Sequence, residues 1–291
     1  SPITLRTYDN NGDGIIDSSE QREYIKIEGM KAINSSGHVV SIENSHDIIL
    51  KNLAASHSGI SRYLVVISIS GENGPSYNVL IEDVWTWGHG RYGIQIWRSH
   101  DVTVRRAVMR YDAGDYLGQP VSGVVTYYSR NVAIENAMSF DQAKSNQEQS
   151  GFYSTGHYDT SLPNNDNKWL GTIALGNPSL GYASDSDSGT DNNVYQNCVG
   201  WGNGFVGLSI IRSTTKNTTI ENCLFGGNSE RGFYHGGGVT GTIFKHNLII
   251  SNIGKGIDSR SVSYAEKNYN NSWNNAGGNG DPGPDGISQD P

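Results

Sequence analysis

The chain is short of charge, of cysteine and of long apolar runs. Only 17% of its 291 residues are charged and two are cysteine, which excludes a disulfide framework. No apolar run approaches the roughly 18 residues that a membrane-spanning helix needs. Leucine is sparse, and no stretch keeps apolar residues at the spacing of an amphipathic helix, so we expect few helices.

The residues that are abundant favour tight turns between strands. The chain holds 37 glycines and 16 tyrosines, and asparagine and serine are frequent. Glycine and asparagine tolerate the left-handed backbone that many turns require. The net charge of −8 argues against a nucleic-acid partner, which needs a basic face, and suits calcium and soluble glycans. The composition therefore predicts an all-β protein with many turns.

The start of the chain bears on its location. It opens at Ser1 without an initiator methionine, and SPITLRTYD already has the character of a strand. We expect that a leader was removed or a longer protein was cut, and that an earlier coil preceded Ser1. We predict a secreted or cell-surface protein.

A short motif recurs along the chain, in which a polar residue follows a strand-like run. Its copies lie 23 to 31 residues apart, with one step of 61 residues that leaves room for two coils. Recurrence at such a period is typical of a solenoid, in which each repeat stacks on its neighbours. The copies are DIILKNL (47–53), NVLIEDV (78–84), DVTVRRA (101–107), NVAIENA (131–137), NNVYQNC (192–198), NTTIENC (217–223) and GTIFKHN (241–247), with the polar position at Asn52, Asp83, Arg106, Asn136, Asn197, Asn222 and Asn247.

Stacking of the coils places these polar positions above one another. Asparagine amides at the same turn of successive coils would then hydrogen-bond in a column and extend the backbone ladder into the side chains. The preceding strands (VVSIEN, LVVISIS, YGIQIW, VSGVVTYY and FVGLSII) are apolar enough to face a shared interior. The alternative is an ordinary β-sandwich in which the IEN strings recur by coincidence. Seven aligned copies favour the solenoid.

With this repeat laid out, the chain resembles the pectate-lyase-like superfamily of right-handed parallel β-helices over roughly residues 25–275. The resemblance implies a single all-β solenoid domain, with an edge strand and loop at 1–24, the parallel β-helix at 25–269 and a cap or tail at 270–291. This scaffold is shared by lyases, hydrolases, epimerases, adhesins and phage proteins, so it implies no particular reaction. Two polar inserts, 141–170 and 176–191, interrupt the coils, and such loops on a rigid scaffold commonly carry function.

The sharpest local motif is the segment DNNGDGIIDSSE at residues 9–20. It resembles the calcium-binding loop of EF-hands and the single loops of dockerin-type domains, with Gly14 where such a loop turns sharply. The alternative is a solvated turn that binds no ion. We expect a bound calcium ion to stabilise the first coil and to take no part in catalysis. The predicted calcium ligands are Asp9, Asn11, Asp13, Ile15 through its carbonyl, Asp17 and Glu20.

The two cysteines are expected to be neighbours in the stack. Cys198 and Cys223 directly follow the aligned Asn197 and Asn222, so they should occupy the same place in successive coils. Residues in register on adjacent coils lie about 4.8 Å apart, near the lower end of disulfide spacing. We favour two stacked buried thiols, and a disulfide stays open. Neither cysteine fits a catalytic nucleophile or a zinc site.

Stacking also brings the segments after each aligned position onto one continuous side. WTWGHGRYG (85–93), MRYDAGDY (109–116) and SFDQAKSN (139–146) then place charged and aromatic residues on adjacent coils. Aromatic faces bind the C–H patches of sugars, and charged side chains bind hydroxyls and carboxylates. The candidate catalytic residues are His89, Arg91, Asp112, Asp115, Asp141 and Lys144, and the candidate substrate-binding residues are Trp85, Trp87, Arg110, Tyr111 and Tyr116.

Two reactions could use this set. In uronate β-elimination, a cation neutralises the substrate carboxylate and a base abstracts the C5 proton, so the three aspartates would hold calcium and Lys144, His89 or Arg91 would be the base. In glycoside hydrolysis, two carboxylates flank the bond, and Asp141 would act with one of the other aspartates. The alternative is that these loop residues form a solvated face.

The sequence departs from the family pattern at the points that would support a lyase. The segment NNVYQNCVGWGNGFVGL is similar to β-helix pectate lyases but lacks the aspartate pairs that bind calcium in those enzymes. There is also no close match to the YDPHD-type signature of alginate epimerases.

We predict an extracellular protein that acts on or binds acidic polysaccharide, with lyase or glycoside hydrolase activity as the enzymatic form. The alternative is a non-catalytic surface protein, such as an adhesin, a sheath or a filament subunit that stacks on further copies through its end coils. A carbohydrate-binding or virion-tail module is the third hypothesis. We expect no nucleic-acid partner and no membrane-spanning segment.

Overall fold

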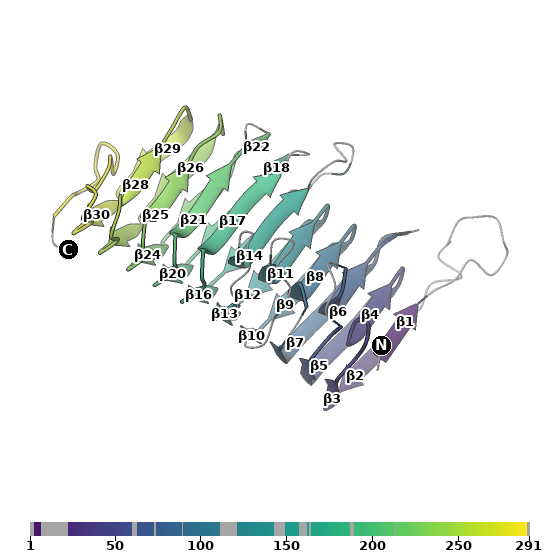
Figure 1. Ribbon diagram of the computed structural model, residues 1–291. Coiled ribbons are helices and arrows are strands. Elements are labelled where there is room, and N and C mark those ends of the chain that lie inside the picture. The colour runs from purple at the N-terminus through teal and green to yellow at the C-terminus, as the bar shows by residue number, and fades with distance from the viewer. Residues whose placement is uncertain are drawn as a thin grey trace.

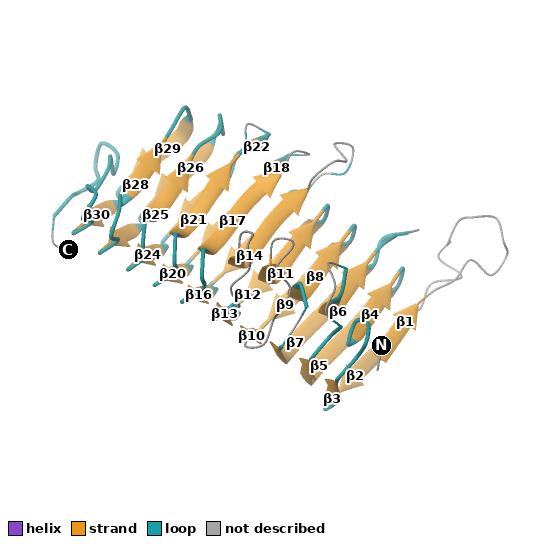
Figure 2. Cartoon of the chain, viewed as in Figure 1, coloured by secondary structure: helices purple, strands orange, loops and turns teal. Residues whose placement is uncertain are grey.

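The computed structural model describes residues 3–6, 23–59, 63–72, 74–88, 90–110, 121–142, 149–156, 162, 164–186, 189–212 and 214–289. Over these residues the regular structure consists of short strands, and every strand pairing is parallel. The strands stack along one axis, from β1 at one end to β30 at the other (Figure 1), with loops between them and no helix in the described part (Figure 2). The predicted right-handed parallel β-helix is confirmed. No helix of the described chain is long and apolar enough to cross a membrane.

The first sheet, sheet 1, contributes one strand from each coil. Its ten strands pair in chain order, so each lies beside the strands of the preceding and following coils. They are β1 (Ile3–Arg6), β4 (Val40–Glu43), β6 (Val65–Ser70), β8 (Tyr92–Trp97), β11 (Val121–Tyr127), β14 (Gln149–Gly156), β17 (Leu180–Ser186), β21 (Val206–Ile211), β25 (Arg231–His235) and β28 (Ile257–Ser259).

The second sheet, sheet 2, has eighteen strands in two limbs, because β5 (His46–Ser56) and β7 (Tyr77–Trp87) are long enough to run through both. The first limb holds β2 (Ile25–Glu28), β9 (His100–Arg105), β12 (Arg130–Glu135), β15 (Lys168–Leu170), β19 (Val194–Gln196), β23 (Thr219–Glu221), β26 (Thr242–Lys245) and β29 (Tyr264–Asn268). The second limb holds β3 (Lys31–Ile33), β10 (Val108–Arg110), β13 (Met138–Phe140), β16 (Ile173–Leu175), β20 (Val199–Trp201), β24 (Leu224–Gly226), β27 (Leu248–Ile250) and β30 (Asn271–Trp273). A separate pair joins β18 (Thr190–Asp191) to β22 (Thr215–Lys216).

The recurring polar position lies in the turn between the two limbs. Its residues adopt the left-handed conformation, with φ near 50° at Asn52 and at Asn136, which lets the chain change direction between the limbs. The sequence alignment is wrong at Asn247, however. Glu221 pairs with Lys245, so His246 lies in this turn and Asn247 lies one position further on.

The amide column exists, but other asparagines form it. Asn177, Asn203, Asn228, Asn252 and Asn275 are buried, and the side-chain nitrogen of each donates to the side-chain oxygen of the next at 2.7–3.0 Å. We call these five residues the asparagine ladder. The buried asparagines satisfy one another and also bond backbone carbonyls, for example Asn228 Nδ2 to Gly200 O at 3.1 Å. The predicted residues of the limb turn do not form this column because that turn faces solvent. Asn247, which was also predicted and lies one position past the turn, is buried and donates to Asn270 Oδ1 at 3.0 Å.

A column of glycines lies on the strands of sheet 1 and was not foreseen. Its members on β14, β17 and β21 are Gly151, Gly181 and Gly207. A Cβ on Gly207 would meet the carbonyl oxygen of Gly232 at 2.6 Å, and each of the others faces the next glycine carbonyl at 2.5–2.8 Å. Glycine is required there because the coils approach too closely for a side chain.

The interior is one continuous apolar core with aromatic stacks along the axis. Trp169 stacks on Tyr195 at 4.6 Å and Phe233 on Phe244 at 4.4 Å. Cys198 and Cys223 are buried free thiols, with the backbone nitrogen of Cys198 only 3.4 Å from Cys223 Sγ, so the prediction of stacked thiols is confirmed.

The outer faces of the two limbs of sheet 2 differ in polarity. Along the first limb, Glu28, Lys51, Glu82, Arg105 and Glu135 are in register and alternate in charge. Along the second limb, most outward positions are apolar. Some of these side chains are exposed to solvent, among them Trp85 (51% exposed), Leu175 (42%) and Trp201 (38%).

The last coil is followed by irregular chain that folds back on it. β30 still pairs with β27. Beyond it, the Asn275 amide donates to Asn279 Oδ1 at 3.2 Å and Ser272 N donates to Ile287 O at 2.9 Å. The final coil therefore has hydrogen-bond partners beyond its last strand.

Candidate functional site

More than half of the residues predicted for function lie outside the described part of the chain. This holds for His89, Asp112, Asp115, Lys144, Tyr111 and Tyr116, and for the calcium ligands Asp9, Asn11, Asp13, Ile15, Asp17 and Glu20. Their roles stay predictions.

Four of the remaining candidates lie on or beside the second limb of sheet 2. Trp85 and Trp87 are on β7, and their rings lie 4.8 Å apart with a 40° tilt. Arg110 pairs in register with Trp87 from β10, and its Nε lies 3.4 Å from Asp141 Oδ2. Asp141 has φ 51°, so it occupies a left-handed turn after β13. Two residues predicted for different roles, Arg110 for substrate binding and Asp141 for catalysis, are therefore brought together as an ion pair at a turn.

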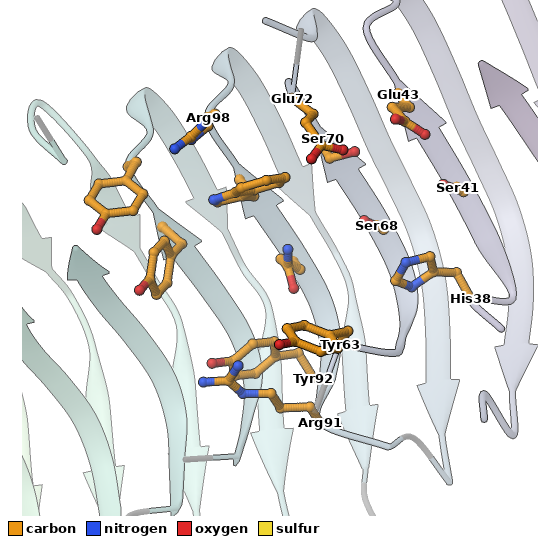
Figure 3. A pocket seen from close by; sticks show the side chains of 14 residues that line it. His38, Ser41, Glu43, Tyr63, Ser68, Ser70, Glu72, Arg91, Tyr92 and Arg98 are labelled. Carbon is orange, nitrogen blue, oxygen red and sulfur yellow. The ribbon is translucent and has the colours of Figure 1, made fainter. Parts of the chain in front are cut away.

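The fifth candidate, Arg91, lines a groove on a different surface. The groove has a volume of about 770 Å³ and lies over β4, β6, β8 and β11 on the outer face of sheet 1 (Figure 3). It crosses the strands, so its length follows the axis of the helix. It is lined by His38, Ser41, Glu43, Tyr63, Ser68, Ser70, Glu72, Arg91, Tyr92, Gln95, Trp97, Arg98, Tyr127 and Tyr128.

The floor of the groove is set by strand register. Ser41 on β4, Ser68 on β6 and Gln95 on β8 pair directly, and all three point outward because their neighbours along each strand fill the core. On the following strands, Val125 and Tyr153 occupy this row and are buried in a second apolar cluster. The polar floor therefore ends at β11.

Aromatic rings and cations form the sides of the groove. Figure 3 shows Tyr63, Tyr92 and Arg91 together on one side and Glu72 and Arg98 on the other. The Arg91 guanidinium lies 4.7 Å from the centre of the Tyr92 ring. The Arg98 guanidinium lies 5.0 Å from that of Trp97. Such contacts hold the cations in place over the rings.

Arg98 and Tyr128 occupy an unusual backbone conformation. Their φ values are 49° and 52°, in the left-handed region where glycine and asparagine are common and bulky residues are not. Asn44 takes the same conformation at the equivalent turn two coils earlier. Arg106 and His246 adopt this conformation at turns away from the groove, so the conformation by itself assigns no role to Arg98 or Tyr128.

Two titratable groups at the β4 end of the groove have shifted pKa values. Burial raises the pKa of Glu43, an effect that Arg6 opposes from 3.0 Å and the Glu72 carboxylate reinforces. Burial lowers the pKa of His38, whose Nδ1 accepts a hydrogen bond from the Val65 backbone at 3.2 Å. His38 is therefore a neutral imidazole at pH 7 that carries its proton on Nε2, so it acts as a hydrogen-bond donor and not as a base.

The sequence contained a signal for this groove that we did not use. The strands VSIE, VVISIS and YGIQIW alternate apolar with polar residues, which marks one face as outward. We used these strands only as evidence for a core, so Trp97, Gln95 and Arg98 were missed.

Comparisons with known proteins bear on the fold. No protein-family model matches the sequence, and no curated protein matches it. Solved structures do match. The A-module of the mannuronan C-5 epimerase AlgE6 from Azotobacter vinelandii has a TM-score of 0.62 at 14% identity, over 93% of this chain and 84% of that one. The pectate lyase Pel9A has 0.57 at 12% identity, over 91% and 76%. The periplasmic alginate epimerase AlgG has 0.56 at 13% identity, over 82% and 74%.

The fold is that of the pectate-lyase-like β-helices. At 12–14% identity these likenesses show the fold alone, and they transfer no residue role to this chain.

Proposed function

We propose that this protein binds an extended acidic polysaccharide along the groove of sheet 1. The observation that carries the proposal is the combination of a long surface groove with aromatic rings, a polar floor and two arginines along it. The structural neighbours include enzymes of alginate and pectate, which are acidic polysaccharides, and this agreement at the level of fold supports the proposal.

The groove offers each kind of contact that a sugar chain uses. The rings of Trp97, Tyr92 and Tyr127 would receive the apolar C–H faces of the sugars. Ser68 and Gln95 on the floor would hydrogen-bond hydroxyl groups. Because the groove follows the axis, successive sugars would contact successive coils.

Two arginines and two carboxylates line the groove. Arg91 and Arg98 lie on the coil of β8, whereas Glu72 follows β6 one coil before and Glu43 lies two coils before, on β4, so an acidic ligand is favoured at the β8 end. A guanidinium matches a carboxylate in shape and hydrogen bonding, so we assign these two arginines to uronate carboxylates. We propose an extracellular or cell-surface location on the same ground, because polysaccharides of this kind are found there.

Whether the bound chain is also cleaved is part of the same proposal. Of the predicted catalytic residues that the structure describes, Arg91 lines the groove, and His89, Asp112, Asp115 and Lys144, which lie outside the described residues, remain proposed partners in a lyase or hydrolase reaction. A lyase would produce an unsaturated sugar that absorbs in the ultraviolet, and a hydrolase would produce new reducing ends.

The test is binding of uronate and neutral polysaccharides to wild-type protein and to two variants. We expect binding to alginate or polygalacturonate and weaker binding to neutral chains. Trp97→Ala should weaken binding about 10-fold or more, corresponding to a stacking contact of about 1.4 kcal/mol. The matched control is Trp201→Ala, an exposed tryptophan on sheet 2, which should leave affinity unchanged.

A second variant tests the acidic character of the ligand. Arg91→Gln should reduce affinity for uronate chains and spare any affinity for neutral chains. Equal affinity of wild type and Trp97→Ala for every polysaccharide would contradict the groove assignment. The same samples are assayed for unsaturated products and reducing ends.

Assembly with other copies of the chain is a second candidate function. The outward apolar positions of the second limb favour it, because contiguous exposed apolar surface marks interaction sites. A second copy presents side chains at the same spacing of about 4.8 Å, which allows the two faces to interdigitate. Sedimentation velocity at rising concentration tests it, with Leu175→Lys expected to abolish any dimer.

A further inference from the structure

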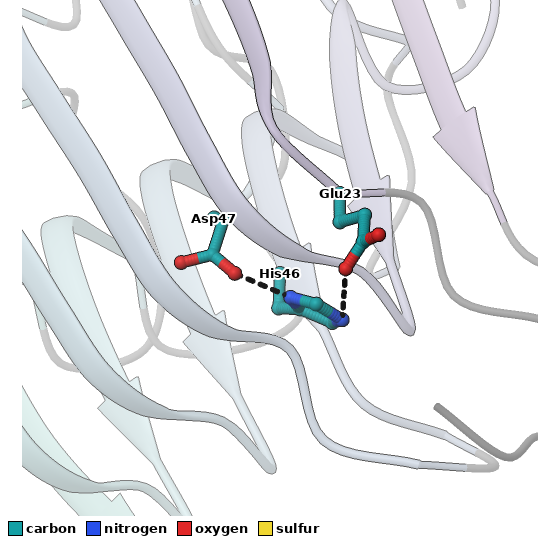
Figure 4. Close-up of side chains that lie close together, drawn as sticks. All are labelled: Glu23, His46 and Asp47. Carbon is teal, nitrogen blue, oxygen red and sulfur yellow. Dashed lines mark hydrogen bonds and ion pairs between the residues drawn. The ribbon is translucent and has the colours of Figure 1, made fainter. Parts of the chain in front are cut away.

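A cluster of three titratable residues lies apart from the groove, at the first coils of the helix. His46 and Asp47 begin β5, and Glu23 precedes β2 on the coil before (Figure 4). His46 Nδ1 lies 2.7 Å from Asp47 Oδ2, and His46 Nε2 lies 3.5 Å from Glu23 Oε2. The imidazole is therefore flanked by a carboxylate at each of its nitrogens.

The contact with Asp47 orients the histidine ring. A carboxylate oxygen only accepts hydrogen bonds, so at 2.7 Å His46 Nδ1 donates to Asp47 Oδ2. The atom of the ring that is left to bind a ligand is Nε2. Asn78 Nδ2 donates to the other oxygen of Asp47 at 2.5 Å, and the Tyr77 ring stacks on the imidazole at 4.6 Å. Both the ring and its carboxylate partner are held in place.

Within the described part of the chain, the other nitrogen of His46 has no hydrogen-bond partner. The His46 side chain is 7% exposed, and Nε2 is a buried atom. It faces Glu23 Oε2 at 3.5 Å, which is longer than a hydrogen bond between a nitrogen and a carboxylate. A buried imidazole nitrogen that faces a carboxylate at this distance needs a positive charge between the two atoms, which a metal ion supplies.

We propose that Glu23 and His46 bind a divalent transition-metal ion, with zinc as the preferred ion. Zinc bonds of about 2.1 Å to nitrogen and to oxygen, at a tetrahedral angle, place the two donor atoms about 3.4 Å apart. The observed separation is 3.5 Å. Asp47 would take the supporting role common at zinc sites, where a carboxylate accepts the second N–H of the ligating histidine. Glu23 is 46% exposed, so water reaches the remaining coordination positions.

The choice of zinc over calcium follows from the ligands. An imidazole nitrogen suits zinc and its neighbours in the transition series, whereas calcium takes oxygen ligands. The site is thus separate from the predicted calcium loop, whose last ligand, Glu20, precedes Glu23 by three residues in the sequence. It is also independent of polysaccharide binding at the groove.

A second histidine–aspartate pair in the described chain has the same geometry as His46 and Asp47 but no counterpart of Glu23. His100 and Asp101 repeat the same motif on β9, with the same 2.7 Å contact, and Tyr77 stacks on His100 at 5.2 Å. Among the described residues, no further carboxylate joins this pair to complete a group of potential ligands. Glu23 therefore distinguishes the proposed site from an ordinary histidine–aspartate turn.

The experiment is a titration of the full chain with Zn²⁺ by calorimetry, with calcium in excess so that calcium sites are saturated. We expect one zinc ion per chain. Glu23→Gln and His46→Ala should remove this binding, and Asp47→Asn should weaken it about 10- to 100-fold while keeping a residue that tolerates the left-handed backbone. His100→Ala is the control and should bind zinc as the wild type does.

Cobalt provides a second measurement on the same proteins. Co²⁺ in place of zinc should give the intense visible absorption of a tetrahedral site in wild type and in His100→Ala, and not in Glu23→Gln. Far-ultraviolet circular dichroism checks that each variant is folded. The proposal is overturned if wild type binds no zinc, or if binding persists unchanged in Glu23→Gln and His46→Ala.

Discussion

The asparagine ladder makes a quantitative prediction about stability. Asn228 lies near its middle and is fully buried. Its Nδ2 donates to Gly200 O at 3.1 Å and to Asn252 Oδ1 at 2.9 Å. Its Oδ1 accepts from the backbone nitrogen and the side-chain nitrogen of Asn203, both at 3.0 Å. Asn228→Ala removes all four hydrogen bonds at once.

The expected loss of unfolding free energy is about 4 kcal/mol. Each hydrogen bond contributes about 1 kcal/mol net, and the partners left behind are buried, so water does not replace what they lose. A domain is stabilised by roughly 5–15 kcal/mol in total, so the loss is a large part of the whole. The matched control is Asn222→Ala. Asn222 is exposed in the limb turn with φ 54°, and alanine there should cost about 1 kcal/mol through the left-handed backbone alone.

Denaturation in urea, followed by far- and near-ultraviolet circular dichroism, measures both variants. Coincident transitions by the two probes are needed before free energies are compared, because repeat proteins can unfold in parts. The reasoning is refuted if Asn228→Ala costs no more than Asn222→Ala.

Three further predictions concern other parts of the stack. Gly207→Ala should destabilise the fold by about 2 kcal/mol in the same denaturation assay, because its methyl group would meet a backbone carbonyl at 2.6 Å; an unchanged midpoint would contradict the close approach of the coils. Glu82 has its pKa lowered to about 2, chiefly by its hydrogen bond to Arg105, so its stabilising effect is complete above about pH 4.5 and is lost as pH falls toward 2. Thermal melts across this range should show that loss in wild type, and a clearly smaller one in Glu82→Gln. Calcium should raise the melting temperature of wild type and leave Asp13→Ala unchanged, whereas equal melts with calcium and with chelator would count against the predicted loop.

The sequence was sufficient to predict the fold because the repeat has a fixed geometrical meaning. A polar residue after a short strand, recurring at coil length, marks the turn between the limbs of sheet 2, and Asn52, Asn136 and Asn222 do occupy that turn. The stacked thiols followed from the same alignment. The sequence alignment is off by one residue at Asn247. The last copy, GTIFKHN, ends in two consecutive polar residues, His246 and Asn247, and the sequence alone does not say which of them lies in the turn.

The asparagines of the ladder also share a sequence context, but it can be recognised only once the structure is known. Each follows a residue in the left-handed conformation at the end of the second limb, such as Gly202 before Asn203 and Gly227 before Asn228. In this chain, asparagine directly after the left-handed residue that ends the second limb is a buried amide, whereas asparagine at the limb turn itself, such as Asn222, is exposed. Both look like turn residues in the sequence.

The candidate site was harder to predict than the fold. The sequence pointed to the loops that follow the second limb, and of those residues Arg91 reaches the groove. The groove depends on which strand residues face outward and where apolar residues replace the serines of its floor, and these depend on register across several coils. The pairing of Glu23 with His46 is likewise a contact between coils.

The spacing of the asparagine ladder has a consequence for how this chain tolerates change in length: its successive members are 26, 25, 24 and 23 residues apart, and the column stays closed throughout. Asn203 and Asn228 are 25 residues apart, and so are Cys198 and Cys223. Removal of residues 198–222 would join Asn197 to Cys223 and bring Asn177 opposite Asn228, with every column closed again. A single-residue deletion inside a strand would turn the side chains that follow it in that strand to the wrong face. The ladder intervals of 26, 25, 24 and 23 residues show that the turns, by contrast, accommodate single-residue differences between coils. Such a protein can therefore be shortened or extended by whole coils or at its turns, and not within its strands.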